Sequence, residues 1–233
     1  MGVASIVREL GWADGALYVV GRALEKVSAK RLRIIKYYLV AQPIGRLSAK
    51  PMRPDTSTEI TVVLQDDPQV FAFPRPASVL ARRYAGGARC TVARVRGEFA
   101  GFIWTQRMSY EEDELRCNYV LEEPELSIWD FDVYIEPRFR IGRTMARLWS
   151  HVDAELAVTG VRWSFSRISA FNPASRTSHA RLGAIDCCSA LFLLAGSSQL
   201  SCLPEWPYLH LSCGKQRAPV LRLRPPHLVD LDH

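Results

Sequence analysis

The sequence has no long apolar run. The longest one, residues 190–195, is far shorter than the ~20 residues that a helix needs to cross a bilayer. The first eight residues hold no apolar signal core, and no internal repeat is evident. The 233 residues are 48% hydrophobic and 23% charged, which excludes a disordered, collagen-like or coiled-coil chain. We therefore expect a soluble, cytoplasmic globular protein with no membrane partner.

Lysine is scarce, so arginine carries most of the basic charge. The chain has 30 basic residues and a net charge of +6, and its lysines are limited to positions 26, 30, 36, 50 and 215. Arginine favours planar contacts with phosphate or carboxylate, so an anionic ligand is plausible, although genome composition alone gives the same excess. No aromatic-plus-basic motif accompanies the charge, so we do not expect nucleic acid as a partner.

Metal-site spacing is also lacking. None of the six cysteines forms a pair separated by two residues, and Cys187 and Cys188 are adjacent. This pattern predicts no metal and reduced, mostly buried thiols.

The hydrophobic pattern divides the chain into three parts. Residues 1–55 are expected to form an N-terminal extension, with a helix at 13–28, a strand at 32–40 and a Pro-containing linker at 45–57. The main domain spans residues 56–215, and a Pro/Arg-rich tail follows at 216–233.

The main domain alternates between strands and helices. Helices between strands imply crossover connections and a mixed sheet covered on at least one face, an α/β or α+β architecture. A hairpin is expected across Arg96–Gly97, and a loop at 110–114. The expected strands are 59–64, 88–95, 98–107, 127–135, 161–168, 184–194 and 208–212, and the expected helices are 76–84, 142–158 and 172–182.

Residues 172–184 have a local and a functional interpretation. Asn172 followed by proline is typical of a helix N-cap, and Gly183 is typical of a helix C-terminal stop. His179 lies on the same predicted helical face as Ser175, where a histidine is commonly a packed or hydrogen-bonded residue. Capping and packing alone would account for the segment.

The strand at 127–135 leads into a loop that holds Arg140, Gly142 and Arg143 and ends at a predicted helix. A helix N-terminus presents unpaired backbone N–H groups and a partial positive charge, which suit a phosphate group. Glycine lets the backbone approach that group closely. The loop is a candidate anion site, although Gly142 would also serve as a simple helix start.

These two segments resemble motifs B and A of the GCN5-related N-acetyltransferase (GNAT) superfamily. Motif B has an asparagine after a strand, a small residue three positions later, often a tyrosine seven positions later, and then Leu-Gly-Phe. Asn172, Ser175 and Gly183 match it, His179 stands at the tyrosine position, and Ala184 replaces the phenylalanine.

Motif A is a strand that leads to a glycine-rich loop at a helix N-terminus. Gly142 fits this loop, whereas Phe139 stands where glutamine or arginine is usual and Thr144 where a small residue is usual. The resemblance covers residues 59–213. It implies a GNAT-like fold with a mixed, mostly antiparallel central sheet flanked by helices, to which the N-terminal helix and strand are added.

The resemblance also implies a site for acetyl-CoA. In the family, the strand of motif A and the next strand, here 127–135 and 161–168, splay apart and receive the pantetheine arm. The cofactor-binding residues implied here are Val133, Ile135, Arg140, Ile141, Gly142, Arg143, Thr144, Asn172 and Ser175.

The family mechanism is direct attack of an amine on the thioester carbonyl. His179 would protonate the leaving thiolate, and Asp132 or Asp130 would take the amine proton. The two aspartates alternate along the strand, which predicts that they share one face. Asp132 is favoured because it lies nearer the expected thioester. The other interpretation is that both aspartates face water and His179 packs in the sheet–helix interface.

The predicted function is that of an acyl-CoA-dependent N-acyltransferase that moves acetyl from acetyl-CoA to an amine. The acceptor would be a small molecule or a protein, and a homodimer is compatible with this function. The alternative is a non-catalytic protein of the same fold that binds a ligand or partner, which the degenerate phosphate loop favours.

Overall fold

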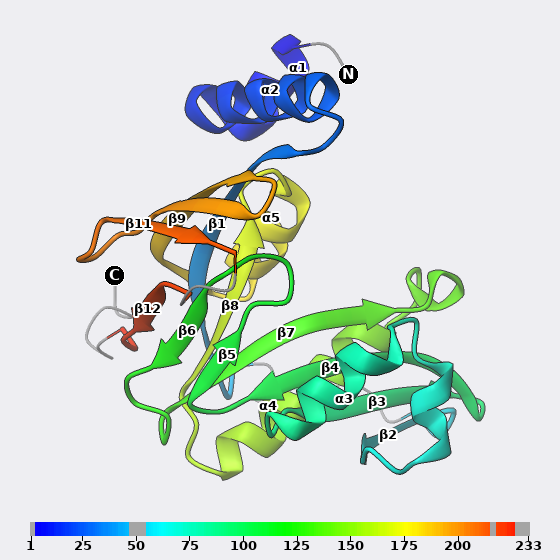
Figure 1. Cartoon of the computed structure of the whole chain (residues 1–233). Coiled ribbons are helices and arrows are strands. Elements are labelled where there is room, and N and C mark those ends of the chain that lie inside the picture. Colours follow the sequence, from blue (N-terminus) through cyan, green and yellow to red (C-terminus); the bar gives the residue numbers. More distant parts are fainter. Residues whose placement is uncertain (1–2, 47–54, 215–217, 227–233) are drawn as a thin grey trace. The chain divides into compact units, whose positions relative to one another are not determined.

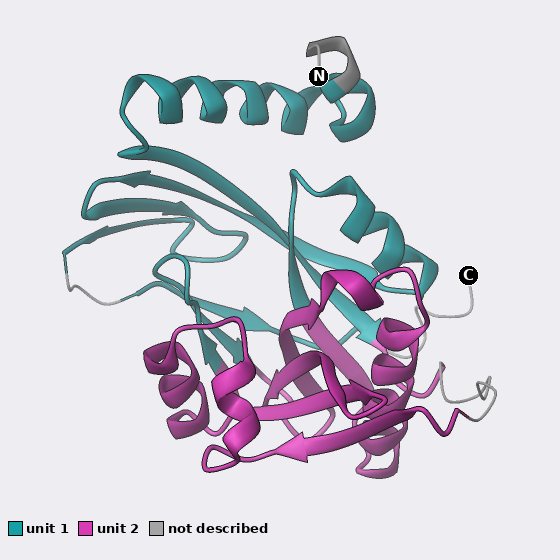
Figure 2. Ribbon diagram, turned by 90° about the vertical axis from the view of Figure 1, so that its right-hand side faces the viewer, with its two compact units in different colours: residues 1–42, 110–120, 166–233 teal, residues 43–109, 121–165 magenta. Residues whose placement is uncertain are grey.

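The computed structural model describes residues 3–46, 55–214 and 218–226. The predicted linker and the predicted C-terminal tail lie partly outside these residues. The chain divides into two compact units, shown in different colours in Figure 2. Unit 1 comprises residues 1–42, 110–120 and 166–233, and unit 2 comprises 43–109 and 121–165. No helix in the described part of the chain is long and apolar enough to cross a membrane.

Unit 2 is built on a sheet with the strand order β2-β3-β4-β7-β8 (Figure 1). Neighbouring strands are antiparallel except β7 and β8, whose parallel ladder covers three residue pairs. The chain passes from unit 2 to unit 1 within β8. The elements are β2 (Thr58–Val63), η1 (Pro68–Ala72), α3 (Ala77–Ala85), β3 (Arg89–Val95), β4 (Glu98–Gln106), β7 (Ser127–Ile135), η2 (Pro137–Phe139), α4 (Thr144–Val158) and β8 (Trp163–Ser169).

Helices cover both faces of this sheet, α3 on one side and α4 on the other (Figure 1). On the α3 face, the ring of Tyr84 meets that of Trp104 edge-on, with 4.8 Å between centroids. On the α4 face, Thr105 and Ile128 line a cavity together with residues of α4. Helix α4 buries Leu148, Trp149, Val152 and Leu156, whereas Met145, in its first turn, is 40% exposed.

The pairing of β7 with β4 contains a β-bulge. Phe131 pairs with Trp104, but the next pair is Tyr134 with Phe102, so β7 has one residue more than β4 between them. Asp132 lies in this interval and has a φ of 47°. One extra residue bends a strand and changes the direction of the side chains beyond it.

Unit 1 has a second group of antiparallel strands in the order β11-β10-β9-β1, with β8 next to β1. A separate three-stranded sheet has the order β12-β6-β5. The elements are α1 (Val3–Leu10), α2 (Trp12–Val27), β1 (Leu32–Pro43), β5 (Ser109–Glu111), β6 (Asn118–Leu121), α5 (Pro173–Arg181), β9 (Ile185–Ala195), β10 (Ser198–Cys202), β11 (Leu209–Cys213) and β12 (Val220–Leu223).

The predicted fold class, a mixed and mostly antiparallel sheet flanked by helices, is confirmed. So are the longer elements, and β7 has the predicted bounds. The loop predicted at 110–114 is wrong in part, because β5 includes Tyr110 and Glu111. Four elements were not predicted, α1, β6, β10 and β12, and each has eight residues or fewer. The domain boundaries near residues 55 and 215 stay a prediction.

All six cysteines are free thiols. The predicted burial is right for Cys90 and Cys117 and wrong for Cys187 and Cys213, which are exposed. Cys213 ends β11, which is an edge strand, so one side of it is open to solvent.

Gly101 of β4 is expected to be essential for the close approach of β7. A Cβ at this position would lie 2.7 Å from Cδ1 of Ile135 and closer still to the carbonyl oxygen of Tyr134. Because a backbone atom is in the way, Gly101→Ala should lower the free energy of unfolding by about 3 kcal/mol, the upper end for overpacking. Urea denaturation measures this change.

Gly142→Ala is the matched control for Gly101→Ala. Its Cβ would meet nothing closer than the carbonyl oxygen of Phe139 at 3.6 Å, and its φ is not positive. We expect it to change the free energy of unfolding by less than about 0.5 kcal/mol. Equal stabilities of the two variants would show that β4 and β7 can move apart at Gly101.

Candidate active site

Asp130 and Asp132 lie on opposite faces of the unit 2 sheet, so the prediction that they share one face is wrong. Asp130 pairs with Thr105 and lies on the α4 face. Asp132 contacts Arg75 and Arg83 on the opposite face, where the ring of Trp104 packs against α3. Strict alternation fails because the extra residue of the bulge lies directly after Phe131.

Asp130 is only 3% exposed. Its Oδ2 accepts a hydrogen bond of 2.7 Å from the hydroxyl of Ser164, which lies on the neighbouring strand β8. Asp130 thereby joins β7 to β8 within unit 2. The interpretation that both aspartates face water is therefore wrong for Asp130.

Asp132 is held between two guanidinium groups. Arg75 donates from Nε to Oδ2 at 2.7 Å and from Nη2 to Oδ1, and Arg83 donates from Nη1 to Oδ2. The side chains of Asp132 and Arg83 are 12% and 8% exposed. Both carboxylate oxygens are therefore engaged in charge-assisted hydrogen bonds, which are about twice as strong as neutral ones.

The turn that follows β7 is exposed where the coenzyme was expected. Arg140 donates from Nε to the carbonyl oxygen of Ile135 at 2.9 Å, which closes the turn onto the end of the strand. Ile141 is 99% exposed, and Gly142 and Arg143 are also exposed. The helix begins at Thr144, two residues after the predicted start at Gly142.

The first turn of α4 has no side-chain cap. Arg143 is the N-cap residue and makes no capping hydrogen bond, and the first turn contains no acidic residue. The first backbone N–H groups of a helix have no partner within the helix. This end of α4 is thus suited to an anion. Of the other implied residues, Val133 on β7 is 36% exposed, whereas the side chains of Ile135 on β7 and Thr144 at the start of α4 are buried.

Asn172, Ser175 and His179 all belong to the α5 region of unit 1. The side chain of Asn172 accepts a hydrogen bond of 3.1 Å from the backbone N–H of Ser175, which confirms the predicted N-cap. Gly183 has a φ of 82° directly after the helix, as expected of a C-terminal stop.

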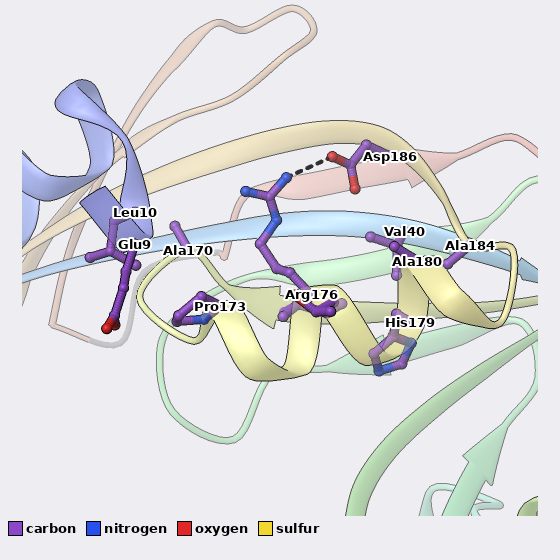
Figure 3. A pocket seen from close by; sticks show the side chains of 12 residues that line it. Glu9, Leu10, Val40, Ala170, Pro173, Arg176, His179, Ala180, Ala184 and Asp186 are labelled. Atoms are coloured by element: carbon purple, nitrogen blue, oxygen red, sulfur yellow. Dashed lines mark hydrogen bonds and ion pairs between the residues drawn. The ribbon is translucent and has the colours of Figure 1, made fainter. Parts of the chain in front are cut away.

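His179 lines a cavity of 490 Å³ beside α5 (Figure 3). The charged residues on its wall are Glu9, Arg176 and Asp186. Arg176 points toward Asp186 in Figure 3 and donates to it at 3.0 Å. The cavity therefore combines charged side chains with an apolar lining from β1, β8 and α5.

Burial lowers the pKa of His179 from its ordinary value of 6.5. Its Nδ1 atom is buried and has no hydrogen-bond partner among the described residues. The imidazole is therefore neutral near pH 7. It can still donate a proton in a hydrogen bond through one ring nitrogen.

The implied site residues are thus distributed over both units. In unit 2, the turn after β7 brings Ile135 and Arg140 into contact beside the start of α4. Arg75 and Arg83 were missed, because they lie 57 and 49 positions before Asp132 and no local pattern marks them. No group of three metal-ligating side chains occurs in the part of the chain that the structure describes.

No protein-family model and no curated protein matches this sequence. A conserved protein of unknown function from Staphylococcus epidermidis has a similar structure, with 14% identity and a TM-score of 0.50. The match covers 74% of this chain and 66% of that chain. This likeness shows a shared fold and does not extend to an activity.

GNAT proteins are among the other similar structures. A putative GNAT acetyltransferase from Novosphingobium aromaticivorans is 21% identical over 71% of this chain and 68% of its own, with a TM-score of 0.45. A tandem GNAT protein from the clavulanic acid pathway is 14% identical over 69% of this chain and 53% of its own, with a TM-score of 0.49.

The lowered pKa of His179 predicts a loss of stability in mild acid. Between pH 6.5 and the lower pKa of the folded state, the unfolded chain binds more protons, so the free energy of unfolding falls as the pH falls. His179→Gln should remove this part of the pH dependence between about pH 7.5 and 5.5. Thermal unfolding across this range measures it.

Ser178→Ala on α5 is the control, because it changes an exposed side chain of the same helix and removes no titratable group. It should leave the pH dependence as in the wild type. An unchanged slope in His179→Gln would show that His179 takes up its proton as readily in the folded chain as in the unfolded one.

Proposed function

We propose that this protein is an acyl-CoA-dependent N-acyltransferase that uses acetyl-CoA and an amine acceptor. The observation that carries the proposal is the path of the chain from the bulged strand β7, through a short exposed turn, to the uncapped start of α4. This is the arrangement that the resemblance to motif A requires. The resemblance of residues 172–184 to motif B supports the same reaction class.

The residues at the turn fit the pyrophosphate of the coenzyme. Gly142 and Arg143 are exposed, and the nearest atom to a Cβ at Gly142 would be 3.6 Å away, so the backbone is open to close approach. The first N–H groups of α4 point along the helix axis toward this surface. Arg143 adds a full positive charge. Together these groups would hold the phosphates at the N-terminus of α4.

The pantetheine arm would follow the end of β7. Val133 is the exposed residue next to the bulge, and the arm would hydrogen-bond to backbone groups near Val133 and Ile135. Holding the thioester and the amine together in this way lowers the barrier by restricting their relative motion.

In the proposed reaction, the amine nitrogen forms a bond to the thioester carbonyl carbon and the carbon–sulfur bond breaks. The coenzyme leaves as a thiolate, and we assign its stabilisation to a hydrogen bond from the ring N–H of neutral His179, as its place in motif B implies. The proton that the thiolate then takes up comes from water. Asp132 would have to give up an ion pair to take the amine proton, and Asp130 is bound to Ser164. We therefore assign that proton to water and give neither aspartate the role of base.

A non-catalytic protein of the same fold is the second candidate. The observation in its favour is that both implied bases are engaged by other side chains. Such a protein would bind coenzyme A or another ligand but release no free thiol with any amine.

Arg143→Glu should weaken binding of coenzyme A at least about tenfold. A carboxylate at the N-cap would repel the pyrophosphate where the wild-type guanidinium attracts it. Gly142→Val should weaken it similarly by keeping the phosphates away from the backbone. Isothermal titration calorimetry with coenzyme A measures both affinities, and circular dichroism verifies the fold.

Arg162→Glu is the charge-matched control. Arg162 is exposed and lies beyond the C-terminal end of α4, so this variant should bind coenzyme A as the wild type does. If it loses as much affinity as Arg143→Glu, the loss comes from the net charge of the chain and not from the position of Arg143. Wild-type affinity in both turn variants would remove the phosphate site from this turn.

His179→Phe should lower kcat by roughly 10²- to 10³-fold, the usual loss when one hydrogen-bond donor to a developing negative charge is removed. Its affinity for coenzyme A should stay close to that of the wild type, because the ring is assigned to the leaving thiolate alone. Release of free thiol from acetyl-CoA with a panel of amines gives kcat. His151→Phe is the control. Full turnover by His179→Phe would show that His179 does not stabilise the thiolate.

A further inference from the structure

The backbone at Asp132 needs support from its surroundings. Its φ of 47° lies in the left-handed region, which residues with a Cβ seldom adopt and which aspartate and asparagine tolerate best. Strain of this kind persists only where neighbouring groups fix the conformation. Since Asp132 lies within the extra length of β7, the groups that hold it also hold the bulge.

Two arginines provide this support. Arg75 binds both carboxylate oxygens of Asp132, and Arg83 binds Oδ2 as well. We call Arg75, Arg83 and Asp132 the bulge clamp. Arg75 comes from the segment before α3, and Arg83 comes from the last turn of α3.

Aromatic rings on β4 and β7 fix the guanidinium groups in turn. The Arg75 guanidinium lies 5.5 Å from the ring centroid of Phe102 and 5.4 Å from that of Tyr134. The Arg83 guanidinium lies over the two rings of the preceding pair, 5.4 Å from Trp104 and 5.1 Å from Phe131. These two ring pairs flank the bulge, so each arginine stacks on one side of it.

We propose that the bulge clamp is a positioning device that sets the backbone of β7 at Val133 to receive the arm of the coenzyme. This inference rests on the proposed function. Asp132 then acts through the backbone conformation and not as a proton acceptor, and Arg75 and Arg83 contribute to coenzyme binding without touching the coenzyme.

Three full-length variants test the clamp. Asp132→Asn keeps a residue that tolerates positive φ but removes the charge. Arg83→Lys keeps the charge but removes the planar fork that reaches the carboxylate and the rings together. Arg89→Lys is the matched control, because Arg89 pairs with Glu155 at 2.8 Å at the surface of the same unit, with its side chain 45% exposed.

Two readouts separate positioning from stability. Hydrogen exchange of the backbone amides at residues 131–135 reports the conformation of β7 without any ligand, and calorimetry with coenzyme A reports binding. We expect Asp132→Asn and Arg83→Lys each to speed exchange and to weaken coenzyme A binding about tenfold, and the double variant to lose little more than either alone. Arg89→Lys should change neither quantity.

Thiol release with the amine panel then separates the clamp from a catalytic base. The clamp predicts a raised KM for acetyl-CoA with kcat within about threefold of the wild type in both variants. A loss of kcat confined to Asp132→Asn, with Arg83→Lys like the wild type, would make Asp132 the base and overturn the inference. Wild-type coenzyme A affinity in both clamp variants would also overturn it.

A failure of the proposed function can be distinguished from a failure of the clamp. If the wild-type protein itself does not bind coenzyme A, the acyltransferase proposal and the coenzyme part of this inference both fall. If the wild type binds and the clamp variants bind equally well, only the clamp falls.

Discussion

The ion pairs of Asp132 with Arg75 and Arg83 maintain a strand that is one residue too long for its partner. The two arginines bind both carboxylate oxygens of the residue that has the left-handed conformation. The bulge in turn sets how Tyr134 and Ile135 approach Gly101, where no Cβ can be accommodated. The path of the chain into the turn before α4 therefore depends on a buried electrostatic contact rather than on the sheet alone.

A second arginine–carboxylate pair uses the same physical solution in unit 1. Glu112 is ion-paired with Arg167, whose guanidinium lies 4.4 Å from the ring centroid of Tyr37. Burial raises the pKa of Glu112, and the charge on Arg167 acts against that rise. The hydroxyl of Tyr37 donates to Glu114 at 2.7 Å, which extends the network toward the surface. Each unit thus holds a charged pair against an aromatic ring.

Part of the arginine excess packs against aromatic rings. Arg75, Arg83, Arg138, Arg167 and Arg176 all lie over aromatic rings within their own units. A guanidinium can stack and form two hydrogen bonds at once, which an ammonium cannot. From the sequence, the excess indicated an anionic ligand or genome composition, and packing was not considered. Arg143, exposed at the N-cap of α4, is among the arginines that still suit an anion.

The sequence predicts the secondary-structure elements better than it predicts the side-chain contacts. Helix α4 follows from periodicity, because it buries one face over many residues. Strand β7 follows from its run of apolar and aromatic residues, and both of its faces are buried from Ser127 to Phe131. The directions of Asp130 and Asp132 do not follow from it, since alternation holds only while the strand has no extra residue. Arg75 and Arg83 could not be predicted as the partners of Asp132, because contacts between residues 57 and 49 positions apart leave no local pattern in the sequence.

Because of the bulge, Asp130 and Asp132 make their contacts on opposite faces of β7. Asp130, on the α4 face, bonds to Ser164 and joins β7 to its parallel neighbour. Asp132, on the other face, fixes the conformation of the strand through α3 and the segment before it. Two aspartates that look equivalent in the sequence therefore have different structural roles. Any change that removes the extra residue would turn the side chains beyond it to the opposite face, so the bulge is as much a part of the candidate site as any side chain.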